Sequence, residues 1–91
     1  MATATLIVRH QVEDYGAWRA VYDSAEALRR QHGGFGAEVL TQPGDKNDLL
    51  VIHRFPSLEQ AQAFAGSTAL HDVMHRAGVR GAPRVDITVE V

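Results

Sequence analysis

The sequence predicts a single α+β domain over residues 1–91, with strands and helices in the order βαββαβ. Apolar residues alternate with a period of two along four segments, as in strands, and recur at helical spacing in the stretches between them. The length of 91 residues and the 45% hydrophobic content suit one compact core. This order commonly gives a four-stranded antiparallel sheet, in the spatial order 4-1-3-2, with both helices on one face.

Turn signals and capping residues set the predicted boundaries. Gly33-Gly34 ends the first helix, residues 43–47 have turn composition, and Ser57 caps the second helix with Gln60 at the capping-box spacing. The predicted elements are a strand over 5–12, a helix over 14–31, strands over 35–42 and 48–55, a helix from 58 that is interrupted at 66–68 and continues over 69–77, a loop over 78–83 and a strand over 84–91.

The alternation along the strands separates two faces of the sheet. The face apolar enough to lie under the helices contains Leu6, Val8, His10, Val12, Phe35, Ala37, Val39, Leu49, Val51, His53, Phe55, Val85, Ile87, Val89 and Val91. The other face has an apolar centre formed by Ile7, Leu40, Leu50 and Ile52, surrounded by Arg9, Glu38, Arg54, Asp86 and Glu90. Because the helices cover only one face, we predict a homodimer in which these centres pack together and the charged residues pair around them.

Composition excludes several classes of protein. The net charge is −2 and the nine Lys and Arg are dispersed, which argues against nucleic acid as a partner. The absence of cysteine excludes disulfides, thiolate metal sites and a cysteine nucleophile. The N-terminal stretch has neither a signal-peptide pattern nor a membrane-spanning length of apolar residues, so we expect a cytoplasmic protein. No phosphate-binding or serine-hydrolase motif is present in the sequence.

His10 is the candidate catalytic residue. It lies where the first strand ends and the first helix begins, and the antiparallel last strand and the second helix return to the same end, whereas His53 is expected toward the other end. An imidazole on an apolar face can titrate near neutral pH and accept a proton from a substrate. The alternative is a core histidine satisfied by a backbone carbonyl or by Asp14.

Three aromatic residues on the first helix are candidate substrate-binding residues. Tyr15, Trp18 and Tyr22 share its apolar face and could form a wall for a planar ligand, with the Tyr22 hydroxyl orienting a substrate oxygen. Aromatics at helical spacing also simply fill cores, and this alternative stays open.

His71 and Met74 complete the candidate substrate site. His71 and His75 have the spacing of a metal clamp, but no adjacent glutamate makes this the zinc-hydrolase motif. With Met74 pointing inward, His71 lies on the flank of the helix and His75 faces solvent. We therefore expect no tightly bound metal and no cofactor.

The chain resembles the dimeric α+β barrel proteins, and within them the antibiotic-biosynthesis-monooxygenase-like group, which also contains proteins labelled as cyclases. The resemblance covers nearly the whole chain and is carried by Arg9-His10-Gln11-Val12, Asp14-Tyr15, Trp18, Ser57-Leu58-Glu59, Ala63-Phe64, Ser67, Leu70, Met74, Ala77-Gly78-Val79 and Pro83. It implies a ferredoxin-like fold, a dimer that pairs sheet to sheet into a barrel, and a ligand cavity between the sheet and helices of each subunit.

The same resemblance implies the reaction classes to consider. The group includes cofactor-free oxygenases of polyketide quinones, isomerases and haem-degrading enzymes. In the haem-degrading branch a histidine at the end of the last helix ligates iron, for which His75 is a loose counterpart, but that branch expects an asparagine where this chain has Val8, Arg9 and His10. Haem degradation is therefore a minor alternative.

We accordingly expect an enzyme that acts by proton transfer on a small planar aromatic or polyketide-like substrate, as a cofactor-independent monooxygenase or a cyclase. The alternative is a non-catalytic ligand-binding or stress-related protein that uses the same cavity.

Overall fold

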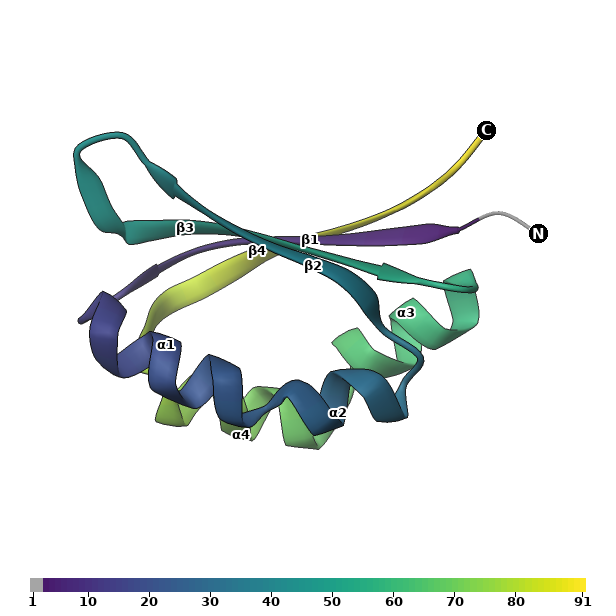
Figure 1. The fold of residues 1–91 in the computed structure, drawn as a ribbon, viewed down its shortest axis with the longest axis horizontal. Coiled ribbons are helices and arrows are strands. Elements are labelled where there is room, and N and C mark those ends of the chain that lie inside the picture. Colours follow the sequence, from purple (N-terminus) through teal and green to yellow (C-terminus); the bar gives the residue numbers. More distant parts are fainter. Residues whose placement is uncertain (1–2) are drawn as a thin grey trace.

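The computed structural model describes residues 3–91, in which four strands form one antiparallel sheet and four helices cover one of its faces (Figure 1). The elements are β1 (Ala4–Val12), α1 (Tyr15–Ser24), α2 (Glu26–Gln31), β2 (Phe35–Gln42), β3 (Asp45–Phe55), α3 (Leu58–Ala65), α4 (Thr68–Arg76) and β4 (Val79–Val89). The order across the sheet is β2-β3-β1-β4, which confirms the predicted arrangement. The first two residues, part of the N-terminal stretch interpreted above, lie outside the described residues.

Side-chain caps begin three of the helices. The Asp14 carboxylate accepts a hydrogen bond of 2.8 Å from the Ala17 N–H at the start of α1. Ser57 Oγ accepts one of 3.2 Å from the Gln60 N–H and donates one of 3.0 Å to Gln60 Oε1, so the predicted cap of α3 is confirmed. Ser67 caps α4, accepting a hydrogen bond from the Leu70 N–H.

The helix predicted over 14–31 is in fact two helices, α1 and α2. Ala25, at φ −93° and ψ 9°, leaves the helical conformation and ends α1. Two side chains donate hydrogen bonds to backbone carbonyl groups at the break. Ser24 Oγ donates to the Val21 carbonyl at 2.7 Å, and the Arg29 guanidinium donates to the Tyr22 carbonyl at 2.9 Å. Arg29 of α2 is thereby held against the end of α1, with its guanidinium over the Tyr22 ring.

Three strands begin earlier than predicted, β1 by one residue at Ala4 and β3 and β4 by more. β3 starts at Asp45, which leaves a shorter turn than 43–47, and β4 starts at Val79, so the loop predicted over 78–83 is wrong. For β4 the cause is a bulge, which lets its pairing with β1 continue to Val79. Arg9 pairs with Arg84 and Gln11 with Arg80, so residues 81–83 stand opposite His10. Gly81 has a φ of +66°, which favours glycine, and it supplies the turn-like composition that suggested a loop.

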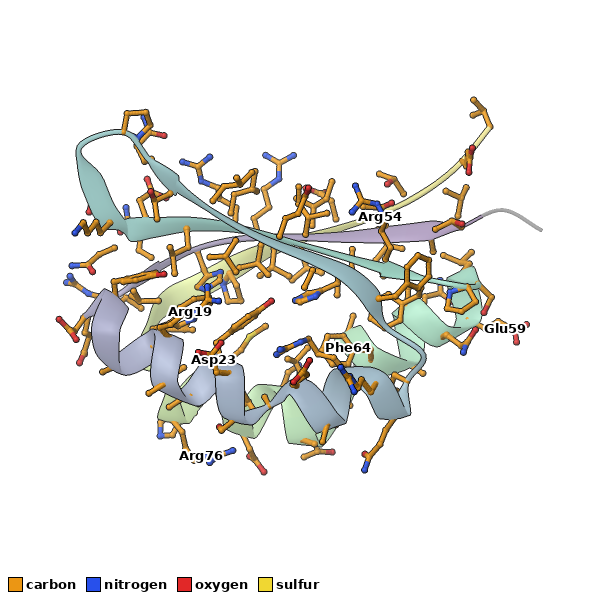
Figure 2. All side chains as sticks on the ribbon, in the orientation of Figure 1. Arg19, Asp23, Arg54, Glu59, Phe64 and Arg76 are labelled. Atoms are coloured by element: carbon orange, nitrogen blue, oxygen red, sulfur yellow. The ribbon has the colours of Figure 1, made fainter. Side chains whose placement is uncertain are left out.

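The inner face, defined as the face covered by the helices, carries the core. Leu6, Leu49 and Phe55 are fully buried there, and Phe64 of α3 packs between helices and sheet (Figure 2). The assignment of Phe35 to this face is wrong. Phe35 pairs in register with Arg54 on the opposite face and is 50% exposed, because a register shift beside Gly36, at φ +62°, displaces it. Three valines assigned to the inner face, Val85, Val89 and Val91, are exposed on or just beyond the edge strand β4.

The outer face, which has no helix over it, carries the predicted apolar centre. Ile7 pairs with Ile52, and Leu50 pairs with Leu40, which is 48% exposed. Around this centre the structure shows ion pairs within the chain, namely Arg9 with Asp48, Arg54 with Glu38 and Arg84 with Asp86. No helix formed by residues 3–91 has the length and apolar character needed to cross a membrane.

Candidate functional site

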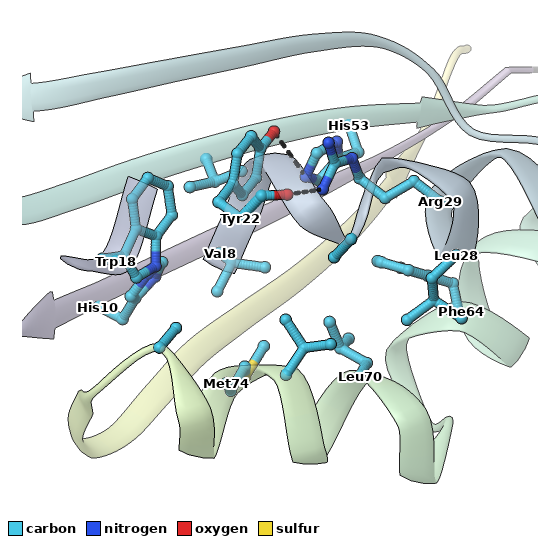
Figure 3. Close-up of a pocket in the computed structure, with 14 residues that line it drawn as sticks. Val8, His10, Trp18, Tyr22, Leu28, Arg29, His53, Phe64, Leu70 and Met74 are labelled. Carbon is cyan, nitrogen blue, oxygen red and sulfur yellow. Dashed lines mark hydrogen bonds between the residues drawn. The ribbon is translucent and has the colours of Figure 1, made fainter. Parts of the chain in front are cut away.

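A cavity of about 60 Å³ lies between the inner face of the sheet and the helices α1, α2 and α4 (Figure 3). Its polar lining comes from His10 on β1, Tyr22 on α1, Arg29 on α2 and His53 on β3. The remaining wall is apolar: Val8, Trp18, Ala25, Leu28, Val51, Phe64, Leu70, Val73, Met74 and Ala77. The cavity is therefore an apolar space with a few polar groups placed at defined points, the usual composition of a small-molecule site.

His10 is buried beside this cavity with its hydrogen-bonding capacity unused. It is 7% exposed, and among residues 3–91 neither Nδ1 nor Nε2 has a hydrogen-bond partner. Asp14, which the alternative interpretation assigned to it, caps α1 instead. Burial lowers the pKa of His10, and the Val8 backbone and the Asp48 carboxylate offset only part of this effect. The imidazole is thus neutral at neutral pH, with a lone pair available to accept a proton.

A row of rings connects His10 to the other polar groups. Trp18, which is 3% exposed, lies 5.7 Å from the His10 ring and stacks on Tyr22 at 4.8 Å. Tyr22 in turn lies 5.8 Å from the His53 ring, nearly parallel to it. These aromatic side chains fill the space between α1 and the sheet and form one wall of the cavity (Figure 3).

The second polar end of the cavity consists of Tyr22, Arg29 and His53. The Tyr22 hydroxyl and His53 Nε2 are 3.4 Å apart, and the Arg29 guanidinium lies 4.1 Å above the Tyr22 ring. Burial, together with the charge of Arg29, lowers the pKa of His53 to about 4. Burial also raises the pKa of Tyr22. At neutral pH the lining groups at this end are therefore a neutral imidazole, a protonated phenol and the Arg29 cation, while Arg19, 5.5 Å from the Tyr22 ring, lies outside the lining.

The prediction that His53 lies toward the other end of its strand from His10 is confirmed by the register, but the cavity extends along the sheet far enough to reach both histidines. His53 is 5% exposed and lies four residues beyond Leu49, the partner of His10, which separates the two histidines by about 13 Å along the strands. The alternation that put His53 on the inner face was sufficient to identify it as a candidate cavity residue. Arg29 could not be found in this way, because it reaches the cavity only through the break between α1 and α2.

Of the residues proposed from sequence, His10, Trp18, Tyr22 and Met74 line the cavity, whereas Tyr15 and His71 do not. Tyr15 stacks on the far side of Trp18 at 6.0 Å. His71 lies with His75 in a separate groove of about 300 Å³ between α4 and β4, whose wall also includes Met74. In the described part of the chain, no three or more His, Asp or Glu side chains gather where they could hold a metal ion.

No family model matches the sequence, and no curated protein matches it. Solved structures do match it along its whole length. One, a candidate antibiotic biosynthesis monooxygenase from Bordetella bronchiseptica, is 12% identical, with a TM-score of 0.82 over 100% of this chain and 99% of that one.

Two further matches have the same architecture. SnoaB, a cofactor-independent oxygenase from Streptomyces nogalater, is 11% identical, with a TM-score of 0.74 over 100% of this chain and 93% of that chain. Rv0793 from Mycobacterium tuberculosis is 17% identical, with a TM-score of 0.72 over 98% and 95% of the two chains. At these identities the similarity establishes the fold. The predicted resemblance to antibiotic-biosynthesis-monooxygenase-like proteins, with their ferredoxin-like βαββαβ architecture, is confirmed at that level.

Proposed function

We propose that this chain, which has the ferredoxin-like fold of antibiotic-biosynthesis-monooxygenase-like structures, is a cofactor-independent monooxygenase of small planar aromatic or polyketide-like compounds. The observation that carries the proposal is His10, a buried neutral histidine with no hydrogen-bond partner in the described residues, beside an aromatic-walled cavity. A buried polar group without a partner is costly, so its retention favours a functional role. The fold shared with SnoaB, itself described as a cofactor-independent oxygenase, supports the same reaction class.

In the proposed mechanism His10 is the general base. It accepts a proton from a carbon acid of the substrate, such as the CH₂ group beside an aromatic ketone, while Trp18 and Tyr22 hold the ring. The carbanion gives electrons to O₂ and forms a C–O bond, and the resulting peroxide anion takes the proton back from His10. Loss of water then leaves a carbonyl on the former CH₂ carbon, so that one oxygen atom enters the substrate and the other leaves as water.

The size of the cavity indicates how substrate enters. A volume of about 60 Å³ holds a few water molecules, less than the several hundred Å³ of typical ligand pockets. Leu28, Arg29 and Met74 are only partly buried parts of the wall, and all three have long flexible side chains. Substrate binding therefore displaces Leu28 and Met74, while the row from His10 to His53 and the Arg29 guanidinium above the Tyr22 ring stay in place.

We also propose that the outer face pairs with the same face of a second copy. An apolar centre on a sheet face without helices supports this arrangement, because such a centre is costly to leave in water. The ion pairs around it would then form the polar rim of the interface.

The first prediction tests the catalytic role. Oxygen consumption with anthrone, which has a CH₂ group beside aromatic rings, is measured for the wild type and for His10→Ala. We expect a loss of about 10²-fold or more in turnover, the usual range for a general base, with the fold intact by circular dichroism. His75→Ala, an exposed histidine outside the cavity, is the matched control and should retain wild-type turnover. Equal turnover in His10→Ala and wild type would refute the assignment.

A further inference from the structure

The end of the cavity opposite His10 holds a cation that no carboxylate neutralises. Arg29 is partly buried and donates one hydrogen bond, to the Tyr22 carbonyl, and in residues 3–91 it has no salt-bridge partner. The ion pairs of the described residues are formed by other arginines: Arg9, Arg19, Arg30, Arg54 and Arg84. A guanidinium has five N–H donors, so most of the Arg29 donors remain for a ligand.

The lining residues around Arg29 add donors and no negative charge, and the two carboxylates that act on Tyr22 from outside the lining, Asp23 and Glu26, are paired with Arg19 and Arg30. The Tyr22 hydroxyl lies at 3.4 Å from His53 Nε2, a long contact that leaves the hydroxyl free to rotate toward a ligand oxygen. His53 stays neutral beside the guanidinium, and among the described residues that line the cavity there is no Asp or Glu. The potential at this end is therefore positive, and an oxygen anion is its natural complement. A carboxylate matches the planar guanidinium in geometry as well as in charge.

The spacing of the two ends sets the shape of the ligand. His10 and His53 are about 13 Å apart along the strands, and the lining between them, including Val8 and Val51, is apolar. We infer that the cavity takes an elongated aromatic acid, with its carboxylate on Arg29 and the Tyr22 hydroxyl and its reacting ring end at His10. This inference rests on the proposed function for the role of the reacting end, and it adds the acid group that selects the substrate.

The test compares an acid with its neutral counterpart. Isothermal titration calorimetry measures binding of 6-hydroxy-2-naphthoic acid and of its methyl ester to the wild type, Arg29→Met and Arg30→Met. Met replaces the guanidinium by an apolar chain of similar length. Arg30 is the matched control, because it belongs to the same helix but is exposed and paired with Glu26 at 3.0 Å. We expect the wild type and Arg30→Met to bind the acid at least about 10-fold more tightly than the ester, and Arg29→Met to lose that preference.

Equal binding of acid and ester by the wild type, failure of the wild type to bind the acid, or an acid preference that survives in Arg29→Met would each overturn the inference. If Arg29→Met does not fold, Arg29→Gln replaces it, and the wild-type comparison stands alone as a test. The result is separable from the catalytic test. An Arg29-dependent acid preference with unchanged turnover in His10→Ala keeps the acid site and removes the role of His10 as general base. A lost turnover in His10→Ala without acid preference keeps the proposed monooxygenase and removes this inference.

Discussion

Two histidines on the same face of the sheet are buried in different ways. His10 has no hydrogen-bond partner among the described residues and lies beside the Trp18 ring, whereas His53 contacts the Tyr22 hydroxyl and lies near the Arg29 charge. Both are neutral in the folded protein, since burial lowers the pKa of each. Their protonation therefore opposes folding.

This leads to a prediction for His53. Its pKa is about 4 in the folded state and near 6.5 when unfolded, so between these values the unfolded chain binds the proton more strongly. The stabilisation by neutral His53 is present above pH 6.5 and is lost as the pH falls toward 4. The full loss lowers the free energy of unfolding by about 3 kcal/mol. Urea denaturation at intervals from pH 7 to pH 4 measures the difference between the wild type and His53→Phe, a ring that fits between Tyr22 and Phe64.

We expect that difference to shift in favour of His53→Phe as the pH falls through this range. The exposed His75→Gln provides the comparison, and its difference from the wild type should stay nearly constant. Parallel pH curves for wild type and His53→Phe would show that His53 is not held neutral.

At the residue scale, the alternation of residues along the strands correctly put His10 and His53 on the inner face. The helical period correctly put Trp18 and Tyr22 over that face. The alternation gives no information on how far a cavity extends along a strand, which is why His53 was not included among the predicted site residues. It also cannot indicate a side chain such as Arg29, whose position depends on hydrogen bonds formed at a helix break.

At the scale of elements, caps and turns determine where the helices begin and how they meet the sheet. α3 is short but carries Ala61 and Phe64 into the core, so its first turn matters to the whole domain. The start of α3 was predictable because Ser57 and Gln60 act through local spacing alone. The starts of β3 and β4 were not, because strand pairing extends across residues whose composition, such as Gly81 and Pro83, is that of a loop.

We predict that Ser57→Ala destabilises the protein by about 1 kcal/mol, because the Gln60 N–H loses its acceptor at the helix start. Thermal unfolding followed by circular dichroism should show a midpoint lower by roughly 4–8 °C. Ser24→Ala serves as the comparison, since that hydroxyl bonds to a carbonyl at the exposed end of α1 and begins no helix. A Ser57→Ala midpoint equal to that of the wild type would mean that the cap contributes nothing to stability.

At the scale of the whole molecule, the one-sided placement of the helices leaves the outer face to be explained. The sheet order and the face assignments came from pattern alone, because a buried face fixes the register of every strand that crosses it. The assembly depends on a second chain and stays a prediction.

For the assembly we predict that Ile52→Glu converts a dimer to a monomer, because a carboxylate at the apolar centre cannot be buried without a partner. Sedimentation velocity at micromolar concentration measures the change. Leu58→Glu adds the same charge at an exposed position on α3, on the helix side, and should remain dimeric. A wild type that sediments as a monomer would exclude the sheet-to-sheet dimer.

Trp18 is the only tryptophan in the chain, and it stands buried in the wall of the cavity. Its indole is therefore the single source of tryptophan fluorescence, and that emission originates from the candidate site alone. Quenching or a spectral shift on adding a compound reports a change next to His10 and Tyr22, without a label and without knowledge of the reaction. The intrinsic fluorescence of Trp18 can therefore be used to screen compounds for binding in the cavity.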